Sequence, residues 1–238
     1  MTKERRVKEP AQKSRGDDAK IKVLVVDDHP IVRQGIRMLV NQESDMAVCG
    51  EAESAPEALQ VLQETEPDVA VVDLALKESS GLDLIKDIRI RRPNVLILVL
   101  SMRDESFYAE RTLRAGAKGY LTKEEGTDKV IEGIRQILDG QYYLSERIEA
   151  KMISRIAGGT PQETPSVDSL TDRELQIYEM IGQGMPTREI AKRLHLSVKT
   201  IDSHREHIKD KLQVDSAAEL LKHAIQWVQG VGGEKQGL

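Results

Sequence analysis

The fold of this 238-residue chain is decided by IKVLVVDDHP (21–30), a strand-length β-branched run that leads into two aspartates and a proline. Outward from this stretch, similar short apolar runs recur at 46–52, 69–74, 95–101 and 118–122. Segments with apolar residues at helical spacing separate them. Apolar strands that alternate with helices form parallel sheets covered on both faces. The sequence therefore predicts an α/β doubly wound five-stranded parallel sheet over residues 21–140.

The rest of the chain shows helical patterns without strands. Residues 141–167 are expected to hold a connecting helix and a linker rich in Gly, Pro, Ser and Thr. Residues 168–229 are predicted to form a small all-α domain of four helices. The polar ends at 1–20 and 230–238 are interpreted as tails, the first of them disordered because it has almost no apolar content.

Polar side chains end four of the five predicted strands. Asp27 and Asp28 follow the first, Asp73 ends the third, Ser101 ends the fourth and Lys123 lies just after the fifth. In a doubly wound sheet these carboxyl ends share one edge, where ligands bind. Clustered carboxylates repel one another, and a hard dication such as Mg²⁺ with oxygen ligands resolves that repulsion. A metal-flanked aspartate can act as a nucleophile toward phosphorus.

Each of these residues alone has an ordinary interpretation. Asp-Asp-His-Pro after a strand is also a turn with a helix N-cap, Ser101 also fits a helix N-cap, and Lys123 also fits a solvated charge. The joint placement on strands one, three, four and five favours a site over these separate explanations.

The motifs in this half resemble the receiver domain of two-component response regulators, which has a flavodoxin-like fold. The resemblance covers about residues 21–140 and is carried by DDHP (27–30), VVDLALKESSGLDLI (71–85), LS (100–101) and AGAKGYLTK (115–123). It implies that Asp73 is the phosphoacceptor. It implies that Mg²⁺ is held by Asp28, Asp73, the backbone carbonyl of Ala75 and, partly through water, Asp27.

The same resemblance assigns a switch. It implies that Ser101 and Tyr120 rearrange on phosphorylation and that Lys123 pairs with the phosphoryl group. Two prolines usual in the family are absent. The loop after the phosphoacceptor reads Leu76-Lys77-Glu78, and Glu124 replaces the proline that often follows the lysine.

The all-α domain reads as a helix-turn-helix. Thr171 and Glu174 form a capping box, and Thr187 and Ser197 are expected to cap the next two helices. In the helix from residue 198 to 212, the predicted inward stripe is Val198, Ile201, Ile208 and Leu212. The opposite face carries Lys199, Asp202, Ser203, Glu206 and Lys209. By itself this pattern also fits a helical interaction domain whose polar face is merely solvated.

The domain resembles LuxR-type DNA-binding domains over about residues 168–229, through LTDRE (170–174) and TREIAKRLHLSVKTIDSHREHIKDKL (187–212). With the receiver, this makes the NarL/FixJ class of transcriptional regulators. The resemblance implies phosphate contacts by Lys199, Thr200, Arg205 and Lys209, and base-facing positions at Asp202, Ser203 and Glu206. Thr187 and Ser197, at helix starts, complete the predicted DNA-binding set. Asp202 or Glu206 would either accept from cytosine N4 or repel misplaced phosphates.

Three further expectations concern this domain. His195, His204 and His207 are not at metal-site spacing with other ligands, so packing or phosphate contact is expected of them. The helix from Ala217 to Val228 is expected to be the dimer surface. Trp227 is expected to be core.

Composition restricts the remaining possibilities. The net charge of −5 comes largely from residues 21–125, with 13 basic and 19 acidic side chains, whereas residues 186–212 carry seven basic and four acidic ones. The acidic total therefore does not exclude DNA as a partner. A single cysteine excludes an internal disulfide, and no apolar run approaches the roughly 20 residues of a membrane span. A cytoplasmic protein without membrane contact is expected.

The predicted function is a phosphorylation-controlled transcriptional regulator rather than an enzyme. A partner histidine kinase would phosphorylate Asp73 with Mg²⁺, and the protein would bind double-stranded promoter DNA as a homodimer. A phosphorylation-independent regulator is one alternative. The other is an aspartyl-phosphate phosphohydrolase, although Ala75 stands where such enzymes carry a second acid.

Overall fold

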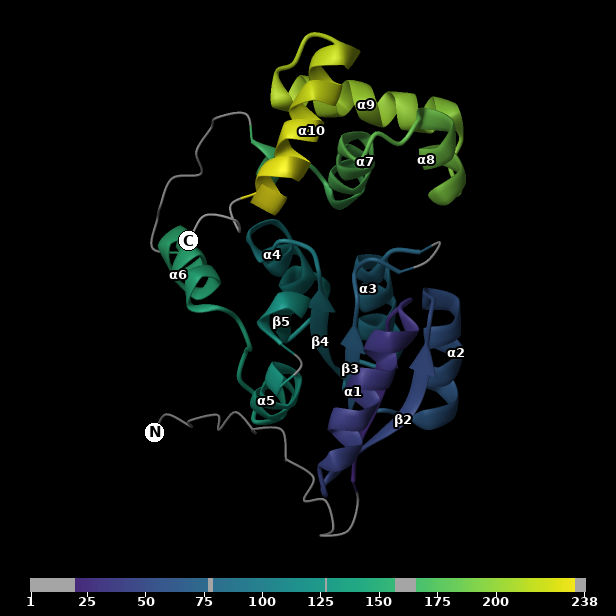
Figure 1. Cartoon of the computed structure of the whole chain (residues 1–238), viewed down its shortest axis with the longest axis vertical. Helices are drawn as coiled ribbons and strands as arrows, with labels where there is room; N and C mark the ends of the chain where they lie inside the picture. Colours follow the sequence, from purple (N-terminus) through teal and green to yellow (C-terminus); the bar gives the residue numbers. More distant parts are fainter. Residues whose placement is uncertain (1–19, 77–78, 127, 157–165, 234–238) are drawn as a thin grey trace, which may run out of the picture.

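The computed structural model describes residues 20–76, 79–126, 128–156 and 166–233. The departure from the family pattern at Lys77 and Glu78 falls outside these ranges, and so do residues 1–19 and 234–238 of the expected tails. The start of the expected tail at residue 230 is wrong, because α10 continues to Gly233. Within them, the chain forms a sheet-based domain and a helical domain that lie end to end (Figure 1). None of the helices in these ranges is both long and apolar enough to cross a membrane.

The first domain is a five-stranded parallel sheet with the order β2-β1-β3-β4-β5. Its strands are β1 (Ile21–Val26), β2 (Met46–Ala52), β3 (Val69–Val72), β4 (Leu96–Ser101) and β5 (Gly119–Thr122). The predicted doubly wound sheet is therefore confirmed. The third strand ends two residues earlier than predicted, at Val72, so that Asp73 lies in the loop that follows it.

Helices cover both faces of the sheet. One apolar core lies under α1 (Pro30–Gln42) and α5 (Asp128–Leu138). The other lies under α2 (Ala55–Thr65), α3 (Gly81–Arg91) and α4 (Glu105–Ala115). The buried strands are built from Val, Ile, Leu and Ala, as a chain with 3% aromatic residues requires.

A separate helix, α6 (Glu146–Ile156), follows the sheet domain and lies beside α4 (Figure 1). Arg147 Nε donates to Glu105 Oε1 at 3.2 Å, and Lys151 Nζ donates to the backbone oxygen of Ser106 at 3.0 Å. The N-terminal end of α4 is therefore held by the connecting helix as well as by the sheet.

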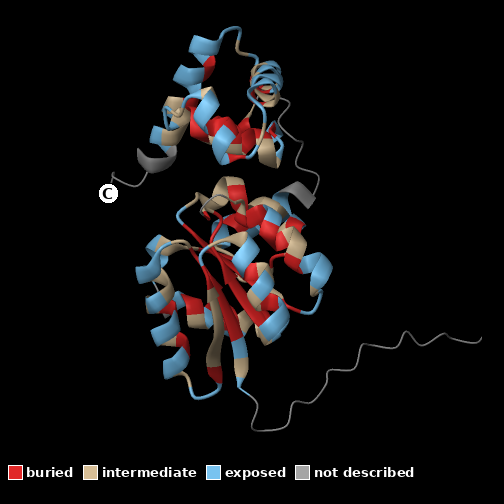
Figure 2. Ribbon diagram, turned by 90° about the vertical axis from the view of Figure 1, so that its right-hand side faces the viewer, coloured by how far each residue is buried: buried red, intermediate tan, exposed pale blue. Residues whose placement is uncertain are grey.

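The second domain is all helical. It contains the short 3-10 helix η2 (Val167–Ser169), α7 (Asp172–Gly182), α8 (Thr187–Arg193), α9 (Val198–Leu212) and α10 (Ala217–Gly233). Helix α7 packs against both α9 and α10, and the buried residues between them belong to the same apolar cluster as those on the α2–α4 side of the sheet (Figure 2). The capping box of Thr171 with Glu174 and the Ser197 cap, which accepts from the Thr200 N–H at 3.0 Å, are both present.

Two local expectations about this domain are wrong. Thr187 is the first residue of α8 and Pro186 is its N-cap, so the Thr187 hydroxyl is free to accept a 3.2 Å hydrogen bond from Arg205. Val198 does not join the inward stripe of α9. It stands in the first turn, before the helix meets α7, and is 43% exposed, whereas Ile201, Ile208 and Leu212 are buried.

Candidate functional site

Two buried carboxylates and one lysine meet at the carboxyl edge of the sheet. Asp27 and Asp73 follow the adjacent strands β1 and β3 and are only 1% and 2% exposed. Lys123, just after β5, places Nζ 2.5 Å from Asp27 Oδ2 and 2.6 Å from Asp73 Oδ2. The parallel sheet thus brings together three residues that lie up to 96 positions apart in the sequence.

The lysine in this cluster is held in its charged form. Burial alone would lower the pKa of the Lys123 ammonium, but the adjacent Asp73 and Asp27 carboxylates outweigh it and raise that pKa. The ammonium group therefore neutralises part of the repulsion between the two carboxylates. It also supplies a fixed cation at the spot where a negatively charged group on Asp73 would extend.

The acidic cluster fits a divalent cation. Asp27, Asp28, His29 and Asp73 each offer a ligand atom, and these atoms lie within 4.8 Å of one another. The Oδ1 atom of Asp28 is buried and accepts no hydrogen bond from the described residues. It lies 2.7 Å from His29 Nδ1, which forms an ion pair with it only when the imidazole is protonated. A buried acceptor without a donor, among oxygen ligands, is what a hard cation such as Mg²⁺ requires.

Three residues around the cluster were not predicted from the sequence. His29 donates its backbone N–H to Asp27 Oδ1 at 2.9 Å, and Arg33 donates to the Asp27 carbonyl at 2.6 Å. Gly81 opens α3 directly against the phosphoacceptor loop, where a Cβ would lie 2.1 Å from the Asp73 carbonyl oxygen. The motif DDHP was the available signal for His29, but no local pattern indicates the packing of Gly81.

The loop after Asp73 is held by the carboxylate itself. The Ala75 N–H donates to Asp73 Oδ1 at 3.1 Å, and the Gly81 N–H donates to the Leu74 carbonyl at 3.2 Å. Every peptide bond in the described ranges is trans, including the one before Glu124, where the family pattern has a proline.

The predicted switch residues lie behind this edge. Ser101 is fully buried and accepts a 3.3 Å hydrogen bond from the Arg103 N–H. Tyr120 is also buried, which raises its pKa well above the ordinary value, and its hydroxyl donates to the Arg103 carbonyl at 2.9 Å. The interpretation of Ser101 as a helix N-cap is wrong, because Asp104 caps α4 by accepting from the Ser106 N–H at 2.8 Å.

The predicted DNA-binding residues lie mainly on one face of α9 and at its start. The exposed members of the set are Ser197, Lys199, Asp202, Ser203 and Glu206, and the half-buried ones are Thr187, Thr200, Arg205 and Lys209. Lys209 places Nζ 2.7 Å from Glu206 Oε2, so this lysine already has an acidic partner. Helix α7 lies between α9 and the sheet domain, which leaves the polar face of α9 accessible (Figure 1).

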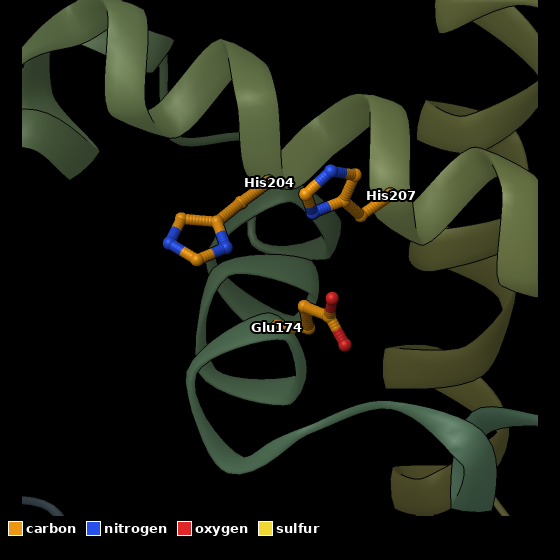
Figure 3. A group of neighbouring side chains, drawn as sticks. All are labelled: Glu174, His204 and His207. Atoms are coloured by element: carbon orange, nitrogen blue, oxygen red, sulfur yellow. The ribbon is translucent and has the colours of Figure 1, made fainter.

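Two histidines of α9 do lie beside another metal-ligand type, contrary to the sequence-based expectation. His204 and His207 approach Glu174 of α7, with ligand atoms within 4.8 Å of one another (Figure 3). The buried Glu174 Oε2 already accepts from Lys211 Nζ at 2.6 Å and from the Thr171 N–H at 2.8 Å. The carboxylate is therefore neutralised within the protein, and we assign this cluster to the packing of α9 on α7.

Both parts of the chain match known families. Residues 23–135 match the family described as "Response regulator receiver domain", and residues 168–224 match "Bacterial regulatory proteins, luxR family". The oxygen regulatory protein NreC of Staphylococcus carnosus (strain TM300) is 34% identical over 211 residues, which cover 87% of this chain and 97% of that protein.

Solved structures of similar architecture include the Salmonella typhimurium RcsB response regulator. It superposes with a TM-score of 0.68 at 25% identity over 88% of this chain and 98% of that one. RcsB from Salmonella enterica serovar Typhimurium, bound to promoter rprA in the presence of phosphomimetic BeF3−, gives a TM-score of 0.64. That match has 26% identity and covers 86% of this chain and 98% of the other.

Proposed function

Because this chain belongs to the NarL/FixJ class of response regulators, we propose that phosphorylation of Asp73 by a partner histidine kinase controls its binding to promoter DNA. The observation that carries this proposal is the buried pair of Asp27 and Asp73 around the Lys123 ammonium group. That arrangement offers a nucleophilic carboxylate, a cation for the product, and acidic neighbours for a metal.

The chemistry follows from these groups. A carboxylate oxygen of Asp73 attacks the phosphorus of a phosphohistidine, the P–N bond breaks, and the imidazole leaves with a proton. Lys123 then pairs with the phosphoryl oxygens in place of the free carboxylate. Asp27, Asp28, Asp73 and the backbone carbonyl of Ala75 would hold Mg²⁺, which when bound neutralises charge on the phosphoryl group. The chain acts as a phosphoacceptor and not as a turnover enzyme.

The output half of the proposal is a dimer on DNA. The exposed polar face of α9 would enter the major groove, and α10 would pair two copies on half-sites about one helical turn apart. RcsB, which has the same architecture, has been solved bound to promoter DNA and as dimers on DNA, and this supports a DNA-bound dimer. The weak basic excess around α9 means that affinity would depend on dimerisation more than on net charge.

The phosphorylation half is tested with radiolabelled acetyl phosphate and Mg²⁺. Wild-type protein should acquire label, Asp73→Asn should not, and Asp139→Asn, which changes an exposed aspartate after α5, should label as wild type does. Equal labelling of Asp73→Asn and wild type would contradict the assignment.

A further inference from the structure

Arg103 is held on its backbone by both predicted switch residues. Its N–H donates to Ser101 Oγ at 3.3 Å, and its carbonyl accepts from the Tyr120 hydroxyl at 2.9 Å. Ser101 ends β4, and Tyr120 lies within the neighbouring strand β5, two residues before its end. A movement of either side chain would therefore act directly on the backbone of this one residue.

The side chain of Arg103 reaches into the other domain. Its guanidinium forms an ion pair with Glu179 of α7 and stacks over the Tyr108 ring, 5.3 Å from the ring centroid. The Tyr108 hydroxyl donates to the same Glu179 carboxylate at 2.8 Å. The Arg103 and Glu179 side chains are only 20% and 13% exposed, so this is a largely desolvated contact and not a surface ion pair.

Further contacts extend the interface along the same face. Asp172 at the start of α7 accepts from Lys86 of α3 at 2.8 Å and from Arg111 of α4 at 3.2 Å. Trp227 of α10 meets the Phe107 ring edge-on, with 5.0 Å between ring centroids. The buried apolar residues of the α2–α4 side continue through this region into the helical domain. The covered elements are α7 and α10, and α9 lies beyond them (Figure 1).

We propose that Arg103 is the positioning residue that makes the placement of the DNA-binding domain depend on the state of Asp73. The proposal rests on the proposed function and adds the residue and the contact that carry the signal. When Ser101 turns toward a phosphoryl group on Asp73, the Arg103 N–H loses its acceptor, and a rearranged Tyr120 no longer holds the carbonyl. The Arg103 guanidinium then leaves Glu179, and the α7–α10 face separates from α4.

This arrangement restrains DNA binding without blocking α9. In the closed form the end of α10 that carries Trp227 is packed on Phe107, while the polar face of α9 stays open. The closed protein is therefore expected to bind an isolated half-site as well as the open protein does. The closed protein should bind more weakly than the open protein only on paired half-sites, where two copies must bring their α10 helices together.

The test uses full-length protein with Arg103→Ala and Glu179→Gln. Both ligands favour the open form, so weakening the closed contact must raise two affinities: that of Asp73 for beryllofluoride and, at least as much because two copies must open, that of the unphosphorylated protein for paired half-sites. We expect roughly fivefold or more for both, at the lower end of usual coupling. Arg103→Lys should retain most of the restraint. Arg114→Ala, which changes an exposed arginine in the last turn of the adjacent α4, should change neither affinity.

A spectroscopic readout makes the test independent of DNA. Trp227 is the only tryptophan, and its indole N–H is buried without a hydrogen-bond partner among the described residues. Beryllofluoride should shift its emission to longer wavelength in wild type, and Arg103→Ala should show that shift without the ligand. The double variant with Arg103→Glu and Glu179→Arg should return the emission toward wild type.

Two results would overturn the proposal. One is that Arg103→Ala and Glu179→Gln leave both affinities within about twofold of wild type. The other is that Trp227 emission ignores beryllofluoride while Asp73 is labelled normally. Either result would leave the proposed function standing, since that is decided by the labelling of Asp73→Asn. If Arg103→Ala fails to fold, the Glu179→Gln and charge-reversed variants decide the question.

Discussion

A lysine meets a buried carboxylate in each domain, and the two pairs differ in what the carboxylate has left to bind. In the sheet domain, Lys123 lies between two aspartates, next to Asp28 Oδ1, which accepts no hydrogen bond from the described residues. In the helical domain, Lys211 and the Thr171 N–H both donate to one oxygen of Glu174, so that the cap and the ion pair satisfy it. The sheet-domain cluster thus keeps an excess of negative charge that can bind a cation, whereas the Glu174 cluster does not and serves as a structural contact.

Removing each lysine in turn should give the largest difference in stability between the two sites. Lys123→Met leaves two buried carboxylates facing each other, and about 3 kcal/mol of unfolding free energy should be lost without metal. Lys211→Met should cost less, about 1–2 kcal/mol, because that lysine is 35% exposed. Urea unfolding with and without millimolar Mg²⁺ distinguishes the two sites, since only Lys123→Met should regain stability with the metal.

The same response of both variants to Mg²⁺ would contradict the difference between the two sites. If Mg²⁺ stabilises Lys211→Met as much as Lys123→Met, the helical cluster binds cations too. Unfolding followed by Trp227 fluorescence reports the helical domain together with its contact with Phe107 of α4, and far-ultraviolet circular dichroism reports the whole chain.

Filling the space at Gly81 should disrupt the sheet-domain site without touching a charge. A Cβ there would lie 2.1 Å from the Asp73 carbonyl oxygen, which is backbone and cannot swing aside. We expect Gly81→Ala to cost roughly 1–3 kcal/mol and to slow labelling of Asp73 by acetyl phosphate. Gly35→Ala on α1, where nothing lies within 4 Å of the new methyl group, is the control and should label normally.

The two pairs should titrate at opposite ends of the pH scale. Burial would raise the pKa of Glu174, but Lys211 and Thr171 lower it below the ordinary 4.5, so its stabilisation is present above that value and lost as pH falls through the lowered pKa. The raised pKa of Lys123 implies stabilisation present below about pH 10.5 and lost above it. Unfolding free energy measured against pH should lose its acid slope below pH 4.5 in Lys211→Met and its alkaline slope in Lys123→Met. Unchanged slopes would contradict these assignments.

The sheet-domain site could be predicted from sequence because strand ends converge by topology. Once IKVLVV and the later runs are recognised as parallel strands, Asp27, Asp73 and Lys123 must share an edge. The contact of Arg103 with Glu179 had no such signal, since it joins a loop to a helix of another domain. The exposure of Val198 was missed for a related reason, because helical periodicity does not say where a helix begins to meet its neighbour.

The smallest expected effect concerns a lysine of α9 that already has a carboxylate partner. Lys209 lies 2.7 Å from Glu206 and its side chain is only 18% exposed, whereas Lys199 is exposed at the start of the helix. A lysine that neutralises a phosphate releases a counterion, so Lys199→Ala should reduce the slope of log affinity against log salt by about one. Lys209→Ala should reduce this slope by less, because Lys209 is already paired with Glu206. Part of the affinity that Lys209→Ala loses should therefore not depend on the salt concentration. Equal slopes for the two variants, measured by fluorescence anisotropy on the same DNA, would mean that Lys209 leaves Glu206 for a phosphate. The ion pair between Lys209 and Glu206 would then not prevent this lysine from binding DNA, unlike the ion pair between Lys211 and Glu174, which satisfies its carboxylate.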